Sequence, residues 1–222
     1  MVPAMTALQR IERAVHALKV FPLPSAVLFP HAALPLHIFE PRYRALVREA
    51  LEGDKVMALA NLHAGWEAQY GGRPPMQPIL CAGLIAWHEE LPDGRYNILL
   101  QGVSRARLVS ELPADKLYRE AEVALLPDAP YEGPEEERVR QAVFELAGRV
   151  PASFAENFLP VVARTHGGAL ADVVAASIVP EPQRRQELLE ELDVRARLIA
   201  VLDDVGELLA RLNPVRPSGP LN

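Results

Sequence analysis

Histidine, cysteine and carboxylate side chains are the groups in this chain that could bind a metal or act as a nucleophile. His88-Glu89-Glu90 is the densest cluster of possible ligands, but no histidine follows His88 four residues later, so the H-E-x-x-H pattern that places two ligands on one helix face is missing. Cys81 is the single cysteine, and no pattern of base and orienting group surrounds it. We therefore expect no metal site and no cofactor, and we interpret Cys81 as a small buried side chain.

The motifs for ATP binding and peptide hydrolysis are also missing. No glycine in the chain is followed by lysine, which excludes the phosphate-binding pattern G-x-x-x-x-G-K-[ST]. A serine and lysine peptidase needs a lysine held near its nucleophile. Lys19, Lys55 and Lys116, the three lysines, lie in or near predicted strands and outside any recognisable peptidase pattern. The sequence predicts a protein without catalytic residues.

Large apolar side chains in and near one long predicted loop form the first candidate binding surface. They are Trp66, Tyr70, Met76 and Trp87. If they are exposed together, they would offer an extended peptide much contact area at low entropic cost. The alternative is that they cover one end of a barrel, which is the more common role of such side chains.

Arginines from adjacent predicted strands form a second candidate surface. Arg95, Arg105 and Arg107 could join Arg42 and Arg44 in a basic patch that contacts RNA phosphates. However, the chain has 29 acidic and 23 basic residues, and no aromatic residues interleave with these arginines. Solvated strand faces or ion pairs explain them better, so RNA binding is the alternative function and we expect no nucleic-acid partner.

Composition indicates a globular protein. Half of the 222 residues are apolar and 23% are charged, which suits a chain that folds around one large core or two small ones. Arg10, Glu12 and Arg13 interrupt the region where a signal peptide would be apolar. The longest apolar runs, such as Ala121 to Leu126, fall well short of the roughly 20 residues that span a bilayer. We expect a cytoplasmic protein with no membrane contact.

Strand patterns dominate the chain up to about Pro127. A helix is predicted from Pro41, with Gly53 ending it in a left-handed conformation. Pro35 indicates an edge or bulge in its strand because proline cannot donate to a ladder. The residues from His63 to Pro78 read as a long loop. The predicted strands are Phe21–Leu23, Leu34–Phe39, Lys55–Leu62, Gly83–Leu91, Arg95–Val103, Arg105–Leu112 and Tyr118–Leu126. Short strands joined by turns suggest a small barrel.

Helical patterns follow the proline-rich segment Pro127-Asp128-Ala129-Pro130. Helices are predicted from Pro134, over Leu170–Ile178, from Pro182, and over a last apolar stripe from Val194 to Leu212. The predicted class is α+β, a small β-barrel with one early helix followed by a helical bundle. We expect a leader that is helical or disordered at 1–18, the barrel at 19–127, the helical subdomain at 131–213 and a tail at 214–222.

Several ordered motifs together resemble a known family. They are Phe21–Pro30 with Leu34–Tyr43, Gly83-Leu84-Ile85, Leu91–Tyr96, Leu100–Arg105, Ala121-Glu122-Val123, Leu170–Ala175 and Gln186–Glu190. The combination resembles the amino-terminal substrate-binding domain of Lon protease, the LON domain, and is most similar to bacterial stand-alone LON-domain proteins. The resemblance implies a PUA-like barrel and a helical bundle, without the ATPase and peptidase domains.

We interpret the residues that carry the resemblance first as fold determinants. Phe39 is expected in the core, and Arg42 is expected to pair with Glu40 or a carbonyl. The remaining motif residues interpreted as structural are Pro30, Tyr43, Gly83, Gly102 and Arg105.

The function implied by the resemblance is recognition of protein substrates or exposed hydrophobic segments, including the role of an adaptor for a separate protease. An RNA-binding protein and an unrecognised hydrolase are the alternatives. The apolar stripe of the last helix suits packing within its own bundle or against a second copy, so a homo-oligomer stays open.

Overall fold

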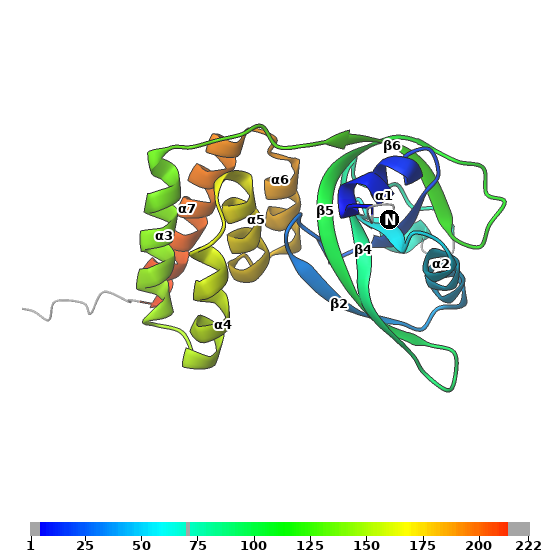
Figure 1. The fold of residues 1–222 in the computed structure, drawn as a ribbon, viewed down its shortest axis with the longest axis horizontal. Coiled ribbons are helices and arrows are strands. Elements are labelled where there is room, and N and C mark those ends of the chain that lie inside the picture. The colour runs from blue at the N-terminus through cyan, green and yellow to red at the C-terminus, as the bar shows by residue number, and fades with distance from the viewer. Residues whose placement is uncertain (1–4, 70–71, 213–222) are drawn as a thin grey trace, which may run out of the picture.

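The computed structural model of the protein describes residues 5–69 and 72–212. It places a strand-rich subdomain beside a bundle of helices, and an extended segment after the last strand joins them (Figure 1). The strands are β1 Leu18–Leu23, β2 Ala33–Ile38, β3 Val56–Asn61, β4 Ile79–Glu90, β5 Tyr96–Glu111 and β6 Arg119–Leu126. The helices are α1 Ala7–Ala14, α2 Pro41–Glu52, η1 Trp66–Gln69, α3 Pro134–Ala147, α4 Ala152–Val162, α5 Gly167–Ile178, α6 Pro182–Glu190 and α7 Val194–Leu212. The predicted α+β class is confirmed.

One long strand closes the sheet into a barrel. Within the described residues the sheet order is β2-β5-β4-β3-β1-β6, and β5 also pairs with β6. The first half of β5 lies beside β2, with Ile98 opposite Leu36, and its second half lies beside β6, with Arg107 opposite Ala124. The prediction of two strands on either side of Ser104 is therefore wrong. They form one strand of 16 residues, because no turn residue interrupts the extended backbone.

Two glycines allow the strands to approach closely where β5 bends. Gly83 lies opposite Gly102. A Cβ atom on Gly102 would lie 2.0 Å from the carbonyl oxygen of Phe29, and one on Gly83 would lie 2.4 Å from that of Gln101. Both contacts are with backbone, which cannot rotate away, so only glycine fits. His31 donates its N–H to the Gly102 carbonyl at 3.0 Å and turns the chain into β2.

Strand β2 lies at the open end of the sheet order, which agrees with the edge position predicted from Pro35. The prediction of Phe39 as a core residue is wrong. Phe39 is 59% exposed, whereas Ile38 is buried. Consecutive side chains of an extended chain point to opposite faces, so Ile38 takes the buried face and Phe39 stacks on His37 with ring centroids 6.2 Å apart.

The helix predicted from Pro41 is confirmed as α2, which buries Tyr43 and Leu46 against the sheet. Its predicted end is wrong in one respect. Gly53 has φ −106° and is not left-handed. Lys55, with φ 62°, takes the left-handed conformation instead and donates its N–H to the Ala50 carbonyl at 2.9 Å. The chain therefore reverses two residues later than the glycine suggested.

Helix α1 lies within the segment interpreted as a leader. Thr6 and Gln9 form a reciprocal capping box at its start, which satisfies two backbone donors that a helix leaves unpaired. Ile11 is fully buried and packs with the apolar cluster of the barrel. Figure 1 shows α1 lying across the barrel.

The long loop between β3 and β4 is held at several points. Leu62 and Met76 form an isolated antiparallel bridge. Arg119 on β6 donates to the Pro74 carbonyl at 2.6 Å and also pairs with Glu111. These contacts hold the described residues at the two ends of the loop against the barrel.

The bundle contains the predicted helices as α3, α5, α6 and α7, together with α4, which was not predicted. Pro160 inside α4 weakened its helical pattern. One apolar cluster continues from the barrel through α2 into the bundle, and it includes Leu59, Leu100, Val143 and Leu198. The boundaries drawn at 19–127 and 131–213 stay a prediction, because the two parts share this core.

Candidate binding clefts

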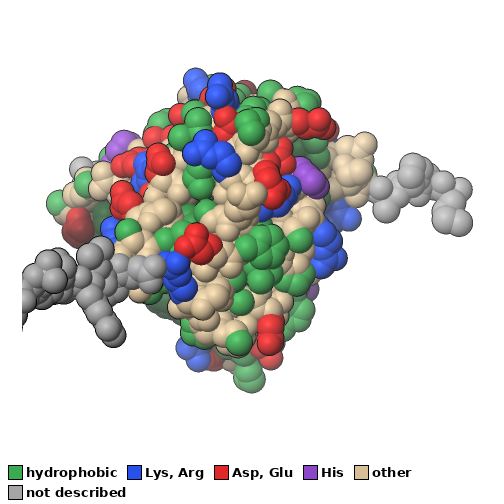
Figure 2. Space-filling view, turned by 90° about the vertical axis from the view of Figure 1, so that its left-hand side faces the viewer, with side chains coloured by type: hydrophobic (Ala, Val, Ile, Leu, Met, Phe, Trp, Pro, Cys, Tyr) green, Lys and Arg blue, Asp and Glu red, His purple; other side chains and the backbone are tan. Residues whose placement is uncertain are grey.

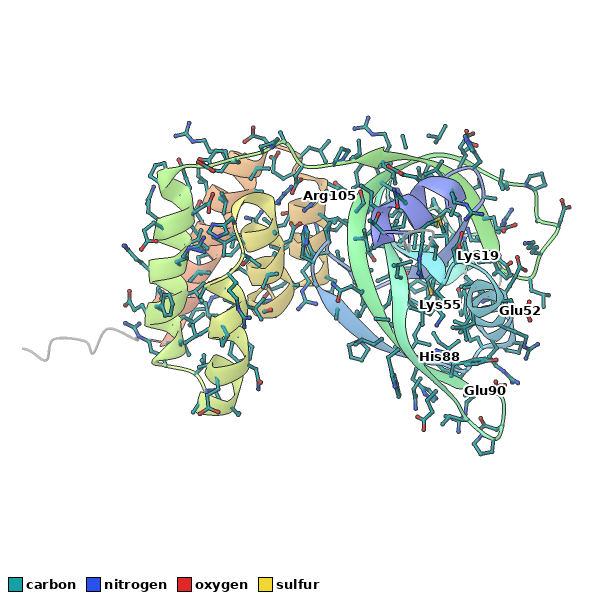
Figure 3. All side chains as sticks on the ribbon, in the orientation of Figure 1. Lys19, Glu52, Lys55, His88, Glu90 and Arg105 are labelled. Atoms are coloured by element: carbon teal, nitrogen blue, oxygen red, sulfur yellow. The ribbon has the colours of Figure 1, made fainter. Side chains whose placement is uncertain are left out.

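A buried group of four charges joins the barrel to the bundle. Arg105 on β5 donates from Nη1 and Nη2 to the carboxylate of Asp172 on α5 at 2.8 and 2.5 Å. Arg197 on α7 pairs with Asp172 at 3.2 Å and also with Asp128 in the segment after β6. Arg105, Asp172 and Arg197 are almost completely buried. Figure 3 shows Arg105 where β5 faces the bundle.

The electrostatics of this group favour its charged state. Burial opposes the charge on Arg105, but the hydrogen bonds and charge of Asp172 outweigh it and hold the pKa of Arg105 above its ordinary value. Arg105 Nε also donates to the Leu189 carbonyl at 2.9 Å, which ties α6 to the sheet.

The arginine surface proposed for RNA is not present as one patch. Arg105 is buried in the four-charge group, so its placement in a solvent-facing patch is wrong. Arg95 pairs with Asp93 at 2.6 Å, and Arg42 pairs with Glu40 at 2.9 Å. These charges are neutralised locally, and the interpretation of ion pairs holds for them.

A cleft of about 610 Å³ lies between the start of β2 and helices α4 and α5. We call it the β2–α4 cleft. Its walls are mostly apolar, and Phe154 and Val161 on α4 are 38% and 41% exposed. Phe154 also packs on the buried Phe158 with ring centroids 5.2 Å apart. The lining residues are His31, Ala32, Ala33, Ser153, Phe154, Asn157, Phe158, Val161, Val173, Ala176 and Ser177.

Local backbone features position the two walls of the β2–α4 cleft. His31 has φ 64°, an uncommon conformation for a residue other than glycine, and it brings Ala32 and Ala33 to the cleft. On α4, Asn157 donates to the Ser153 carbonyl at 2.8 Å. Figure 2 faces the bundle end of the molecule and shows apolar side chains exposed among charged ones. This cleft offers an apolar ligand contact with both subdomains.

A second cleft, of about 550 Å³, lies between the end of β3 and helix α6. We call it the α6 cleft. Most of its lining is polar, and side-chain amides come from both walls. Its lining residues are Pro24, Asn61, Leu62, His63, Ala64, Trp66, Gln77, Pro182, Gln183, Gln186, Glu187 and Glu190.

A shallow apolar depression of about 430 Å³ lies on β2, β4 and β5. Leu99 is opposite Pro35 on one side and Trp87 on the other, so the three side chains share one sheet face. Trp87 is 53% exposed. Beside them, His37 Nδ1 and Asn97 Oδ1 lie 2.7 Å apart.

The aromatic surface predicted from the sequence is divided in the structure. Trp66 lines the α6 cleft, and Met76 is buried in the apolar cluster against which Trp66 packs. Trp87 belongs to the separate depression on the sheet. Tyr70 lies outside the described residues. The structure therefore does not bring Trp66 and Trp87 into one contact surface, and Met76 is not exposed.

The motif residues at the start of the chain lie within the fold. Pro30 and Tyr43 are buried. The Tyr43 ring packs on Phe21 with centroids 4.3 Å apart, and the Arg42 guanidinium lies 4.6 Å from the centre of the same ring. The contact between Tyr43 and Phe21 joins α2 to β1, whereas the contact between Arg42 and Tyr43 lies within α2.

Residues of both clefts were missed by sequence reasoning. Phe154, Phe158 and Val161 are spaced four and three apart, a helical pattern that could have revealed an apolar face of α4. Asn61 and Gln186 gave no such signal, because only the packing of α6 against the barrel brings them to one cleft.

No cluster of three or more His, Cys, Asp or Glu side chains suited to a metal occurs in residues 5–69 and 72–212. Cys81 is fully buried, and burial raises the pKa of its thiol to about 12. Within the same residues no helix is long and apolar enough to cross a membrane.

Residues 17–205 match the family model described as the ATP-dependent protease La (LON) substrate-binding domain. The Lon protease of Desulfosudis oleivorans is 28% identical over 201 residues, which cover 89% of this chain and 24% of that protein. The Lon protease of Paraburkholderia phytofirmans is 30% identical over 192 residues, which cover 84% of this chain and 24% of that protein. The chain thus spans about a quarter of the length of these curated relatives.

Solved Lon N-terminal domains have a similar fold. The Lon N-terminal domain protein from Xanthomonas campestris superposes with a TM-score of 0.65 at 22% identity, covering 85% of this chain and 98% of that one. The N-terminal domain of the Mycobacterium avium complex Lon protease gives 0.67 at 19% identity, covering 86% and 98%.

Proposed function

This chain belongs to the family of ATP-dependent protease La (LON) substrate-binding domains, and from this premise we propose that it is a non-catalytic module that binds exposed hydrophobic segments of protein substrates. Unfolded polypeptides present such segments in extended form. A module that recognises them needs accessible apolar surface in a concave site, and it needs no reactive side chain.

The observation that carries this proposal is the apolar β2–α4 cleft. Phe154 and Val161 remain partly exposed on its wall, although burying such side chains is favourable by about 25 cal/mol for each Å² removed from water. A volume of about 610 Å³ lies in the range of pockets that bind small ligands, and it suits a few apolar side chains of a bound segment. The Trp87 depression is a further apolar contact for a longer segment.

A bound segment could then be passed to a separate protease, in the role of an adaptor. This part of the proposal rests on the names of the relatives, several of which are Lon proteases. RNA binding has less support, because Arg42, Arg95 and Arg105 are engaged with carboxylates.

The proposal is tested by fluorescence anisotropy with a labelled, unstructured peptide that carries several Leu and Phe residues. A matched peptide with serine at those positions is the probe for specificity. We expect the apolar peptide to bind and the serine peptide not to bind. We expect Phe154→Ala to weaken binding about tenfold, because it removes a partly exposed aromatic side chain from the wall of the cleft.

The matched control is Phe144→Ala, since Phe144 is also exposed on the bundle but does not line the β2–α4 cleft. It should change affinity less than twofold. Equal losses in both variants would mean that exposed aromatic area binds the peptide without a defined site. No binding by the unaltered protein would reject the proposed function.

A further inference from the structure

The α6 cleft has walls that the fold holds in place. Gln186 Nε2 on α6 donates to the Ile79 carbonyl on β4 at 2.9 Å, and Arg105 Nε on β5 donates to the Leu189 carbonyl at the end of α6, also at 2.9 Å. These two bonds fix α6 against the sheet. The α6 cleft, which lies between α6 and the end of β3, is therefore formed before any ligand binds. This reduces the entropic cost of binding.

Gln186, which lines this cleft, has a hydrogen-bond acceptor that is unpaired within residues 5–69 and 72–212. Gln186 is only 4% exposed. Its Nε2 donates to the Ile79 carbonyl and to Glu190 Oε1, and both partners are acceptors, so the orientation of the amide is fixed. Gln186 Oε1 has no hydrogen-bond partner among the described residues. Buried polar atoms are nearly always paired in native proteins, and for this acceptor the described residues supply no donor.

Within the described chain, the opposite wall of the cleft carries an unpaired hydrogen-bond donor, the side-chain amide of Asn61. Asn61 is 7% exposed, and its Oδ1 accepts from the N–H of Leu62 at 3.1 Å. This bond leaves Nδ2 as the group available to a ligand, and Asn61 Nδ2 donates no hydrogen bond to any residue in the described part of the chain. The cleft thus combines one unpaired acceptor and one unpaired donor, both from neutral amides.

A peptide unit carries the complementary pair, one N–H donor and one C=O acceptor, whatever its side chain. An extended polypeptide can therefore satisfy Gln186 and Asn61 through its backbone, as peptides do in several recognition modes. Trp66, on the same wall as Asn61, adds an apolar surface.

The Glu190 carboxylate at the α6 cleft favours a ligand with a positively charged side chain. Glu190 accepts from Gln186 Nε2 at 2.8 Å, and no Lys or Arg side chain of the described residues pairs with it. Glu187, on the same helix, is paired with Arg184 at 3.1 Å. Glu190 is therefore a carboxylate at the cleft without a cation, positioned to attract a Lys or Arg of the ligand.

We propose that the α6 cleft is a second binding site, which holds an extended polypeptide through its backbone amides and selects a basic side chain beside Glu190. It shares no lining residue with the β2–α4 cleft. The inference rests on the proposed function, because it assumes that the ligand is a protein segment. It goes further in naming a contact that is independent of apolar side chains and a preference for positive charge.

The test uses the full chain and three labelled peptides that contain the same apolar residues. The first carries one lysine, the second has glutamine in its place, and the third keeps the lysine but is N-methylated at the next peptide bond. We expect the lysine peptide to bind about fivefold more tightly than the glutamine peptide at low salt, with the difference shrinking as salt is added. N-methylation should weaken binding about fivefold, the loss expected for one hydrogen bond.

Variants assign these differences to the cleft. In Glu190→Gln the new amide oxygen still accepts from Gln186, so the fold is kept, and the lysine and glutamine peptides should bind equally. Glu187→Gln is the matched control, because the Glu187 carboxylate is already paired, and it should retain the preference. In Gln186→Met the penalty of N-methylation should disappear.

Two results would overturn the inference while leaving the proposed function in place. One is a lysine preference that persists in Glu190→Gln or is absent from the unaltered protein. The other is an N-methylated peptide that binds as tightly as its parent. In both cases Phe154→Ala would still weaken the apolar peptides. Failure of every peptide to bind would reject the proposed function and the inference together.

Discussion

Arg105 on β5 and Asp172 on α5 form a two-point ion pair, with N–O distances of 2.8 and 2.5 Å, although they are 67 residues apart in the sequence. Both side chains are removed from solvent. Arg197 and Asp128 complete the group, so it contains two positive and two negative charges. The attraction between opposite charges, together with their hydrogen bonds, offsets part of the desolvation cost of burying them.

The same pair contacts one helix of each cleft. Asp172 lies on α5, which forms part of the β2–α4 cleft. Arg105 also holds the end of α6 through the Leu189 carbonyl, and α6 is one wall of the other cleft. The polar group therefore sets how the bundle docks on the barrel, whereas the apolar core supplies most of the stability.

The first prediction is that Asp172→Asn destabilises the protein strongly. The substitution leaves Arg105 and Arg197 buried without their shared carboxylate, and breaking a buried pair in this way costs about 3–5 kcal/mol. Urea unfolding, followed by circular dichroism, measures the free energy of unfolding. Peptide affinity at the clefts should fall as well in the remaining folded protein.

Asp93→Asn is the matched control for this prediction. Asp93 also pairs with an arginine, Arg95, at 2.6 Å, but both side chains are about half exposed. Exposed pairs contribute little to stability because solvent screens them, so this substitution should have a small effect. If the two substitutions had similar small effects, the four-charge group would not be what holds the barrel to the bundle.

The second prediction compares one substitution at two glycines. Gly102→Ala should prevent stable folding or cost about 3 kcal/mol, because the new Cβ atom meets the Phe29 carbonyl oxygen at 2.0 Å and overpacking of this kind is costly. Gly206→Ala should stabilise the protein by about 0.5–1 kcal/mol, since Gly206 lies in helix α7 with open space around it and alanine favours a helix. Thermal unfolding of both variants checks the contrast. A tolerated Gly102→Ala would show that β5 can bend in another way.

Much of this fold could be predicted from local patterns, and the failures have physical causes. Turn residues at Pro92-Asp93-Gly94 and the proline at position 41 identified a hairpin and a helix start correctly. The sequence predicts two strands in place of the single strand β5, because its two halves carry separate motifs. Helix α4 is not predicted because Pro160 lies inside it, and proline disfavours a helix interior. Phe39 was placed in the core because apolar residues are more often buried than exposed.

The candidate sites were harder to predict than the fold. Trp66 and Trp87 are close to one loop in the sequence, but pairing in the sheet separates them. Asn61 and Gln186 are 125 residues apart by their numbers and meet at one cleft only after α6 docks. Arg105 has the sequence pattern of an exposed arginine on a strand. Residue spacing does not predict its buried partner on α5, Asp172. Such sites depend on tertiary packing, which local periodicity does not encode.

The third prediction concerns acid stability. The hydrogen bond from Lys116, with further contributions from Tyr118 and Lys19, lowers the pKa of Glu49 from 4.5 to about 2. A carboxyl group with a lowered folded-state pKa stabilises the protein above its unfolded-state pKa, and this contribution is lost as pH falls through the folded value. The difference in unfolding free energy between the unaltered protein and Glu49→Gln should therefore shrink as pH falls from 4.5 towards about 2.

The effect should be small, because the Glu49 side chain is 41% exposed and solvent screens such pairs to less than about 1 kcal/mol. Glu52→Gln is the control. Glu52 is exposed at the end of the same helix (Figure 3) and pairs with no Lys or Arg within the residues that the structure describes. A difference of equal size and pH dependence in both variants would reject the assignment to the Lys116 contact.

The fourth prediction is that Cys81 reacts with thiol reagents only when the protein unfolds. The thiol is fully buried, and burial raises its pKa to about 12, so the reactive thiolate is rare near neutral pH. Labelling of the folded protein should be at least about a thousandfold slower than labelling in denaturant, given the usual stability of a domain. Ser25→Cys, at an exposed position, should react at once and shows that the reagent is active.

The labelling rate also tests the role of the buried ion pair. If Cys81 becomes accessible through global unfolding, Asp172→Asn should raise its labelling rate by the same factor by which it raises the unfolding equilibrium constant. Cys81 lies on β4 beside Arg105 on β5, so a local loosening of this junction would raise the rate by more than that factor. A rate that does not change at all would mean that the barrel opens around Cys81 independently of its contact with the bundle.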